Sequence, residues 1–261
     1  MHRRYQKFNA ATTPWPRGFE LPATWEPDKT SQKSYIKQTG SLNFLSTGTR
    51  PDITYTTNRL CEANAGPSDQ HKQLLKHLFR YLIGTADLSL CLGGTHSITD
   101  LPLIAFADAA FADRIPTRHS TAGYIVLLAG CPILWKSKRQ TIVALSTTEA
   151  EFMNLTPTGQ ALLWIHRTIQ NLGIRSSKPV IVFTDSRNAQ LTVLNPMNSA
   201  RTRHIDTRFK WIIDRTNQGD FDIQHVSTQD MTADGLTKPL SQDRHVAFVR
   251  LLGLTSPPML K

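Results

Sequence analysis

The chain has 261 residues, 39% of them hydrophobic, which is enough for a buried core in one large domain or two smaller ones. A formal net charge of +10 and a pI near 9.8 favour a polyanionic partner, although a basic surface that only keeps the protein soluble fits them equally well. We find no membrane-length apolar run, no signal-peptide pattern and no metal or disulfide spacing among Cys61, Cys91 and Cys131, so we expect an intracellular chain without a membrane partner.

The N-terminal third is expected to hold an irregular segment followed by helices. Residues 1–34 contain four prolines and little periodicity, which indicates irregular structure. Residues 35–97 show helical signals, the clearest over 68–83, where Ser68 can act as the N-cap and Gly84 as the stop.

One face of the 68–83 helix carries a ridge of positive charge at four-residue spacing. Its members are Lys72, Lys76 and Arg80. Such a ridge most often is a solvated helix face, and a nucleic-acid backbone lying along it is the functional alternative.

From residue 98 to 261 the pattern changes to short apolar runs, which predict strands, alternating with longer helical segments. The first strands are expected at 101–106, 124–128, 133–135 and 142–145, with the basic stretch 136–140 as the connection between the last two. Connections this brief favour antiparallel hairpins.

A long helix is expected at about 147–172, and Pro157 should kink or break it because proline removes a helical hydrogen bond. After it we expect a buried strand at 180–183, helices to about 194 and over 203–217, a strand at 221–226, and a closing helix from about 230. The fold class predicted is therefore α/β, a mixed sheet flanked by helices and preceded by a small, mostly helical segment.

Four acidic residues stand at the ends of these apolar elements: Asp108, Glu151, Asp185 and Asp234. If the first strand neighbours the strand after the long helix, Asp108 and Asp185 emerge side by side and Glu151 reaches them from the helix. Gathered carboxylates repel one another unless cations with oxygen ligands hold them together. The pattern thus predicts a site for two divalent ions such as Mg²⁺, which cleaves a phosphodiester bond.

The third ligand has an alternative in Glu149, which lies two positions before Glu151. Two helix positions diverge by about 200°, so both cannot face one metal. We favour Glu151.

At this point several motifs together resemble a known family. The chain is similar to the ribonuclease H region that closes the polyprotein of Ty1/copia-type retrotransposons, and the likeness covers residues 101–254 nearly continuously. The motifs are PheAlaAspAlaAlaPheAlaAsp at 106–113, SerThrAlaGlyTyr at 120–124, the segment 137–152 with its SerThrThrGluAlaGlu, ThrAspSerArgAsnAla at 184–189, ArgThrArgHisIleAsp at 201–206 and AlaAspGlyLeuThrLysPro at 233–239.

The resemblance implies the ribonuclease H fold and hydrolysis of the RNA strand of RNA–DNA hybrids with Mg²⁺ or Mn²⁺. Its acidic ligands carry over to Asp108, Glu151, Asp185 and Asp234. It also implies that 35–97 is the thumb or connection end of a reverse transcriptase, whose upstream palm and fingers would be a partner. The chain contains no TyrXaaAspAsp-type polymerase motif, so we do not expect it to synthesise DNA alone. The expected location is a cytoplasmic particle or the nucleus.

An RNA–DNA hybrid is recognised mainly by backbone shape and 2′-hydroxyl groups, so basic residues are the candidates for holding it. Apart from the ridge, they are Lys136, Lys138 and Arg139 beside the strands, and Arg201, Arg203 and His204 near the start of one helix.

Two other interpretations remain open. An integrase or transposase of the same broad fold needs a glutamate about 35 residues after the second aspartate, and position 220 holds an aspartate instead. A nucleic-acid-binding fragment of a decayed element, catalytically inert, is the non-enzymatic alternative.

Overall fold

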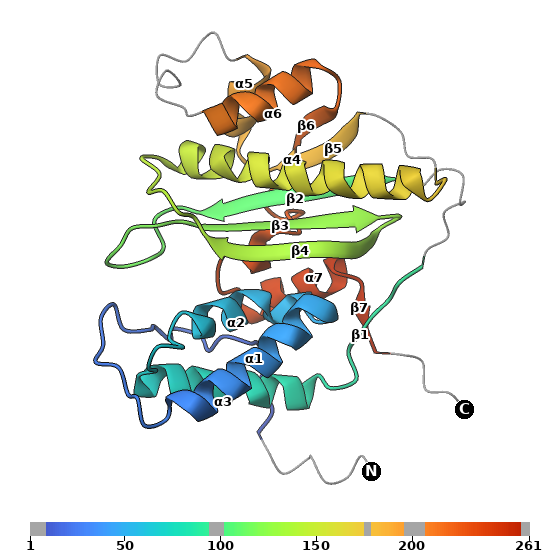
Figure 1. The fold of residues 1–261 in the computed structure, drawn as a ribbon. Helices are drawn as coiled ribbons and strands as arrows, with labels where there is room; N and C mark the ends of the chain where they lie inside the picture. The colour runs from blue at the N-terminus through green and yellow to red at the C-terminus, as the bar shows by residue number, and fades with distance from the viewer. Residues whose placement is uncertain (1–8, 94–101, 175–178, 196–206, 257–261) are drawn as a thin grey trace, which may run out of the picture. The chain divides into compact units, whose positions relative to one another are not determined.

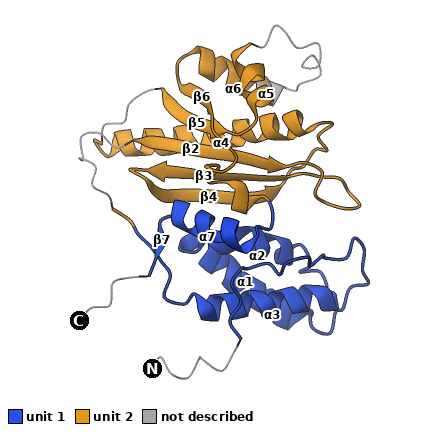
Figure 2. Ribbon diagram, turned by 180° about the vertical axis from the view of Figure 1, so that it is seen from behind, with its two compact units in different colours: residues 1–91, 238–261 blue, residues 92–237 orange. Residues whose placement is uncertain are grey.

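The structure is a computed structural model that describes residues 9–93, 102–174, 179–195 and 207–256, with the side chains of 207–209 left aside. It divides the chain into two compact units, residues 1–91 with 238–261 (unit 1) and residues 92–237 (unit 2) (Figure 2). Each unit is described separately below.

The C-terminal segment 238–261 belongs to unit 1, which differs from the expected single domain over 98–261. Two contacts explain the difference. Strand β7 (Leu254–Thr255) pairs antiparallel with β1 (Ser89–Leu90), and His245 on helix α7 (Gln242–Leu251) lies 2.8 Å from the hydroxyl of Tyr81. Both join positions more than 160 residues apart, which no local sequence pattern encodes.

Unit 1 is mainly helical. Helix α3 agrees with the sequence expectation, because Ser68 caps it and its side chain accepts a hydrogen bond from the His71 amide. Residues 9–31 contain only bends and turns, so the first helix begins three positions before the expected residue 35. The helical elements before α7 are α1 (Gln32–Gly48), the 3₁₀ turn η2 (Pro51–Ile53), α2 (Thr54–Cys61) and α3 (Asp69–Gly84) (Figure 1).

A buried polar network lies inside unit 1. The Arg50 guanidinium donates two hydrogen bonds to the Asp52 carboxylate, at 2.8 and 2.7 Å, and Tyr81 donates to the same carboxylate at 2.7 Å. His245 completes the network beside Tyr81 and is 4% exposed. Burial, and less strongly the Arg50 charge, lowers the pKa of His245 to about 4, although Asp52 acts in the opposite direction.

This lowered pKa predicts that unit 1 loses stability in mild acid. The unfolded histidine titrates near 6.5 and the folded one near 4, so the stabilising neutral form is fully present above pH 6.5 and is lost as the pH falls towards 4. We expect a loss of roughly 2 kcal/mol between about pH 7.5 and 5 from this group. Hydrogen exchange of α3 and α7 peptides measures it. His245→Gln should flatten the pH slope, whereas His225→Gln, at an exposed position, should not; equal slopes would contradict the assignment.

Unit 2 is built on a five-stranded mixed sheet within its described residues, in the order β4-β3-β2-β5-β6. Strand β3 pairs antiparallel with both β2 and β4. Strand β5 pairs in parallel with β2, and β6 pairs in parallel with β5. The predicted fold class, a ribonuclease H-like mixed sheet flanked by helices, is confirmed. The elements are β2 (Leu103–Ala110), β3 (Thr121–Leu128), β4 (Cys131–Arg139), α4 (Thr147–Asn171), β5 (Val180–Thr184), α5 (Arg187–Leu194), α6 (Thr207–Asn217), β6 (Phe221–His225) and the 3₁₀ turn η5 (Asp234–Leu236).

Three local expectations for this unit are wrong. Residues 142–145 do not form a strand. Leu145 is 87% exposed, so its apolar side chain does not pack against the sheet. The basic stretch from Lys136 to Arg139 continues β4 instead of connecting two strands, because it pairs with β3 as far as Thr121. No long helix begins at 230: only η5 forms there, and α7 follows later as part of unit 1.

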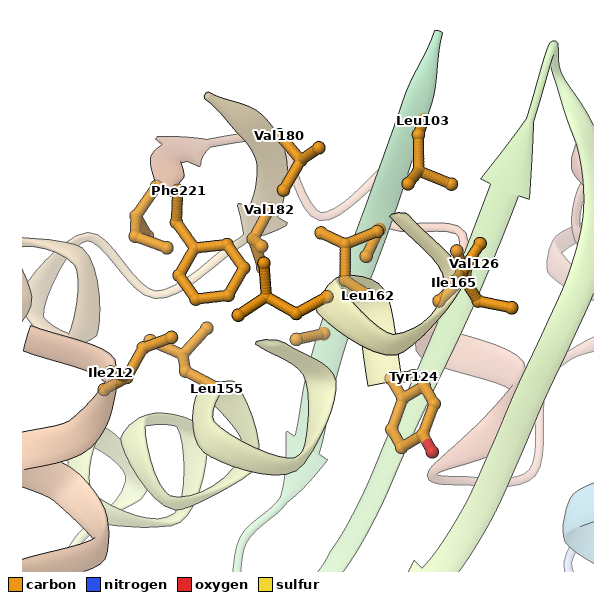
Figure 3. Close-up of a cluster of buried hydrophobic side chains, with 14 of the residues drawn as sticks. Leu103, Tyr124, Val126, Leu155, Leu162, Ile165, Val180, Val182, Ile212 and Phe221 are labelled. Atoms are coloured by element: carbon orange, nitrogen blue, oxygen red, sulfur yellow. The ribbon is translucent and has the colours of Figure 1, made fainter. Parts of the chain in front are cut away.

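Helix α4 packs on β2 and β3 and is continuous through Pro157, so the proline does not break it. Its apolar face, with Leu155, Leu162 and Ile165, meets the strands and α6 in one core (Figure 3). Strand side chains alternate between the two faces of a sheet. Tyr124 and Val126 therefore face α4, and Gly123 faces the opposite side. Across the helices that the structure describes, none combines the length and hydropathy needed to cross a bilayer.

Candidate metal centre

Three of the four expected acidic residues meet in unit 2. Asp108 lies near the end of β2, and Asp185 directly follows β5, which runs parallel beside it with Ala107 opposite Thr184. Glu151 comes from the second turn of α4. One carboxylate oxygen of each residue lies within 4.8 Å of the other two. Neighbouring strands and a packed helix thus bring together groups that are up to 77 positions apart in the chain.

The electrostatics of this cluster are those of crowded like charges. Asp108 is 2% exposed and Glu151 is 8% exposed. Burial first, and then the negative charges of Asp108 and Asp185, raise the pKa of Glu151 to about 10, against a smaller opposing effect of the Ala109 backbone. Three converging oxygen donors are the ligand set that Mg²⁺ and Mn²⁺ favour, so the residues fit a hard divalent cation.

Glu149 is directed elsewhere. Its carboxylate accepts a hydrogen bond from the Leu145 amide at 2.7 Å, and its own amide donates to the Ser146 hydroxyl at 3.1 Å. It therefore closes the N-terminus of α4, as capping residues do. Glu151, and not Glu149, faces Asp108 and Asp185.

Three polar side chains that the sequence did not point to form hydrogen bonds with residues of the cluster, one to the backbone and two to carboxylates. Asn154 is buried and donates to the backbone oxygens of Asp108, at 2.8 Å, and Gly123, at 2.7 Å. Thr237 donates to the Asp108 carboxylate, and Thr228 donates to that of Asp185 at 3.1 Å. One of them carried a local signal, since Asn154 lies one helical turn after Glu151 on the same face.

Asp234, the fourth expected ligand, is not among the three converging carboxylates. It is 4% exposed and begins η5, where its backbone oxygen accepts a hydrogen bond from the Thr237 amide at 3.2 Å. Thr237, the residue that follows η5, also donates a hydrogen bond to the Asp108 carboxylate. This bond connects the segment that carries Asp234 to the cluster. Its role as a ligand stays a prediction.

Gly123 provides the space that η5 occupies. A Cβ atom at this position would lie 2.7 Å from the Thr237 methyl and 2.8 Å from Leu236 Cβ, with the Leu236 carbonyl carbon at 3.2 Å. Only glycine lets the backbone of β3 and η5 approach this closely. The absence of a side chain at Gly123 therefore allows the segment with Asp234 and Thr237 to pack directly on the sheet.

Gly123→Ala is expected to destabilise unit 2 by about 1–3 kcal/mol, because η5 must shift to admit the methyl group. Urea denaturation followed by hydrogen exchange of β3 peptides measures the change. The control is Gly40→Ala, since a Cβ atom there meets nothing within 4 Å. That helix substitution should be neutral or stabilise by about 0.5–1 kcal/mol. Equal effects of the two substitutions would refute the close-packing argument.

The expected nucleic-acid-binding residues have different surroundings. Lys136, Lys138 and Arg139 are exposed on β4. In the ridge on α3, Lys72 pairs with Asp28 at 2.6 Å and Asp69 at 3.2 Å, Arg80 donates to the Asn9 backbone oxygen at 2.6 Å, and Lys76 is exposed. Arg201, Arg203 and His204 lie outside the described residues. The pairing of Lys72 favours a structural role for that residue, and nucleic-acid binding by the others stays a prediction.

The sheet order, the helix across it and the clustered carboxylates define a ribonuclease H-like protein. Similar solved structures include LC11-RNase H1 in complex with an RNA/DNA hybrid, which is 14% identical at a TM-score of 0.41 and covers 52% of this chain and 93% of that one. A foamy viral protease-reverse transcriptase in complex with an RNA/DNA hybrid is 16% identical at a TM-score of 0.38, covering 79% of this chain and 26% of that one.

Relatives in sequence are more specific. The Pol polyprotein from transposon RE2 of Arabidopsis thaliana is 37% identical over 232 residues, 89% of this chain and 16% of the relative. That of transposon TNT 1-94 from Nicotiana tabacum is 36% identical over 222 residues, 85% of this chain and 16% of the relative. No protein-family model matches. The chain belongs to the copia-type retrotransposon Pol polyproteins, and it spans 16% of the length of these two relatives.

Proposed function

We propose that this chain is a ribonuclease H that hydrolyses the RNA strand of RNA–DNA hybrids with two divalent metal ions. The observation that carries the proposal is the meeting of Asp108, Glu151 and Asp185 within 4.8 Å. Membership of the copia-type Pol polyproteins supports it, because a polyprotein that copies RNA into DNA produces such hybrids.

The side chains of the cluster would bind the ions and hold their geometry. Asp108, Glu151 and Asp185 supply oxygen donors, with Asp234 as the proposed fourth ligand from η5. Thr237 and Thr228 orient the Asp108 and Asp185 carboxylates through hydrogen bonds. Two bound metal ions would supply an activated water and stabilise the leaving oxygen. No nucleophilic side chain would then be required.

The substrate would be held by charge. Lys136, Lys138 and Arg139 present exposed cations on β4 of the same unit, and the chain as a whole is strongly basic. Contacts of this kind give sequence-tolerant binding that weakens steeply with salt. Within the polyprotein, the palm and fingers of the reverse transcriptase are the proposed partner, in a cytoplasmic particle or the nucleus.

The integrase alternative is weaker on structural grounds. Position 220, where it would need a glutamate, holds an aspartate that pairs with Arg215 at 3.2 Å at the start of β6. This carboxylate is not part of the metal-type cluster. An inert fragment stays the alternative that the assay must address.

Cleavage of an end-labelled RNA–DNA hybrid by the full chain tests the proposal. We expect RNA fragments with Mg²⁺ or Mn²⁺, none with EDTA, and no cleavage of single-stranded RNA or duplex DNA. A chain that binds the hybrid but leaves it intact with either ion would be the inert fragment.

A further inference from the structure

Unit 2 contains a cavity of about 330 Å³ between the β3–β4 hairpin and helix α4. Tyr124 lies opposite Lys136 in the sheet, and Ala122 lies opposite Lys138. Because directly paired and alternate residues share a sheet face, all four line the side that α4 covers. Helix α4 closes the cavity with Met153, Asn154, Pro157 and Gln160, among others.

The rim of the cavity is positively charged and has no acid to balance it. Lys136, Lys138 and Arg139 line it and are exposed, and no lining residue is an aspartate or glutamate. In the part of the chain that the structure describes, none of these three cations forms an ion pair. By contrast, Lys72 on α3 pairs with Asp28 and Asp69.

Two residues that line the cavity each carry a buried side-chain oxygen without a donor among the described residues. Asn154 uses its amide nitrogen on two backbone oxygens, and Gln140 uses its own on the Ala150 oxygen at 2.8 Å. These bonds fix both amide orientations and leave the Asn154 Oδ1 and Gln140 Oε1 atoms buried without a partner among the described residues. Ligand hydroxyl or amino groups, or water, are the donors that such oxygens accept.

The cavity begins beside the carboxylate cluster. Asn154 lies three positions after Glu151 on α4, about 4.5 Å along the helix axis, and Pro157 lies about 9 Å along it. Asn154 also bonds the backbone of Asp108. A nucleic-acid strand bound at the carboxylates could therefore place a neighbouring nucleotide at this cavity.

We propose that this cavity is a nucleotide subsite for the strand held at the carboxylate cluster. One phosphate contacts Lys136 and Lys138, and the attached sugar or base packs against Met153 and Pro157. The identity of the strand as part of an RNA–DNA hybrid rests on the proposed function. Positive charge beside an apolar wall matches a nucleotide better than an inorganic anion, which uses only the charge.

The first test removes charge. Binding of a fluorescein-labelled hybrid by the full chain is measured by anisotropy in EDTA, so no cleavage is needed. Lys136→Ala/Lys138→Ala is expected to raise Kd about tenfold and to lower the slope of log K against log salt by about two. The control, Arg167→Ala/Lys210→Ala, removes the same charge from exposed positions outside the cavity. Equal losses in the two double variants would overturn the phosphate contact.

The second test fills the cavity without changing charge. Gln160→Phe places a ring at an exposed lining position, and Gln170→Phe makes the same change ten residues further along α4, outside the cavity. We expect about tenfold weaker hybrid binding for the first alone, with the salt slope unchanged because no phosphate contact is lost. Matching melting temperatures establish that both variants fold. Indistinguishable affinities would overturn the subsite.

The two proposals fail separately. Binding that depends on Gln160, Lys136 and Lys138 without any hybrid cleavage would sink the proposed activity and keep the subsite. Metal-dependent cleavage combined with equal binding by Gln160→Phe and Gln170→Phe would do the reverse.

Discussion

Asp185→Asn is expected to lower the rate of metal-dependent hybrid cleavage by about a thousand-fold, which corresponds to about 4 kcal/mol of barrier. Asparagine keeps the shape of the side chain and can still accept the Thr228 hydrogen bond. It removes one of the three negative groups that face one another, so the cluster loses charge for a divalent ion while the fold is retained. Single-turnover cleavage with saturating enzyme measures the chemical step, and anisotropy in EDTA should show unchanged hybrid affinity.

A matched control uses the same substitution on the neighbouring strand. Asp222 lies on β6, opposite Ile181 of β5, and accepts a hydrogen bond from Gln224 instead of facing the cluster. Asp222→Asn should cleave at nearly the wild-type rate. Cleavage that survives Asp185→Asn would remove this carboxylate from the catalytic assignment.

The second large effect concerns stability. Without divalent ions, Asp108→Asn is expected to stabilise unit 2 by on the order of 1 kcal/mol, because it removes the repulsion between the Asp108 and Asp185 carboxylates. Active sites retain such strain because function needs it. With Mg²⁺ or Mn²⁺ the order should reverse: wild type gains about 3 kcal/mol at a hundredfold excess of ion over Kd, and the variant gains much less.

Urea denaturation followed by hydrogen exchange of β2 and β5 peptides separates this response from that of unit 1. Asp214→Asn, at an exposed position on α6, serves as the control and should respond to the ions like wild type. If ions stabilise Asp108→Asn as strongly as wild type, Asp108 does not bind them.

The strands and the helix that position Asp108, Glu151 and Asp185 are elements that the sequence predicted well. Strand β2, which contains Asp108, and strand β5, which Asp185 follows, are mostly apolar, and α4 has a serine N-cap, so local patterns suffice. The convergence of Asp108 and Asp185 then follows from one topological assumption, that their strands are parallel neighbours, which the sheet confirms.

The failures also have physical causes. Residues 142–145 are mostly strand-forming residue types, but the segment lies largely exposed and pairs with no strand. Propensity alone does not reveal this. A proline tends to break an isolated helix, yet α4 is continuous through Pro157. Leu155 and Leu162, on either side of the proline, pack in the core, and such packing stabilises a helix more than local propensity does.

The sequence by itself determined most of the strands and helices and which carboxylates stand near their ends, because periodicity, capping and turn residues act over a few positions. Tertiary structure alone decided that 238–261 packs in unit 1, that Gly123 leaves room for η5, and that the side-chain oxygens of Gln140 and Asn154 are buried without a partner among the described residues. These features depend on contacts between residues that are far apart in the chain. Such contacts are selected by packing and hydrogen-bond satisfaction in the folded state, and no local pattern records them.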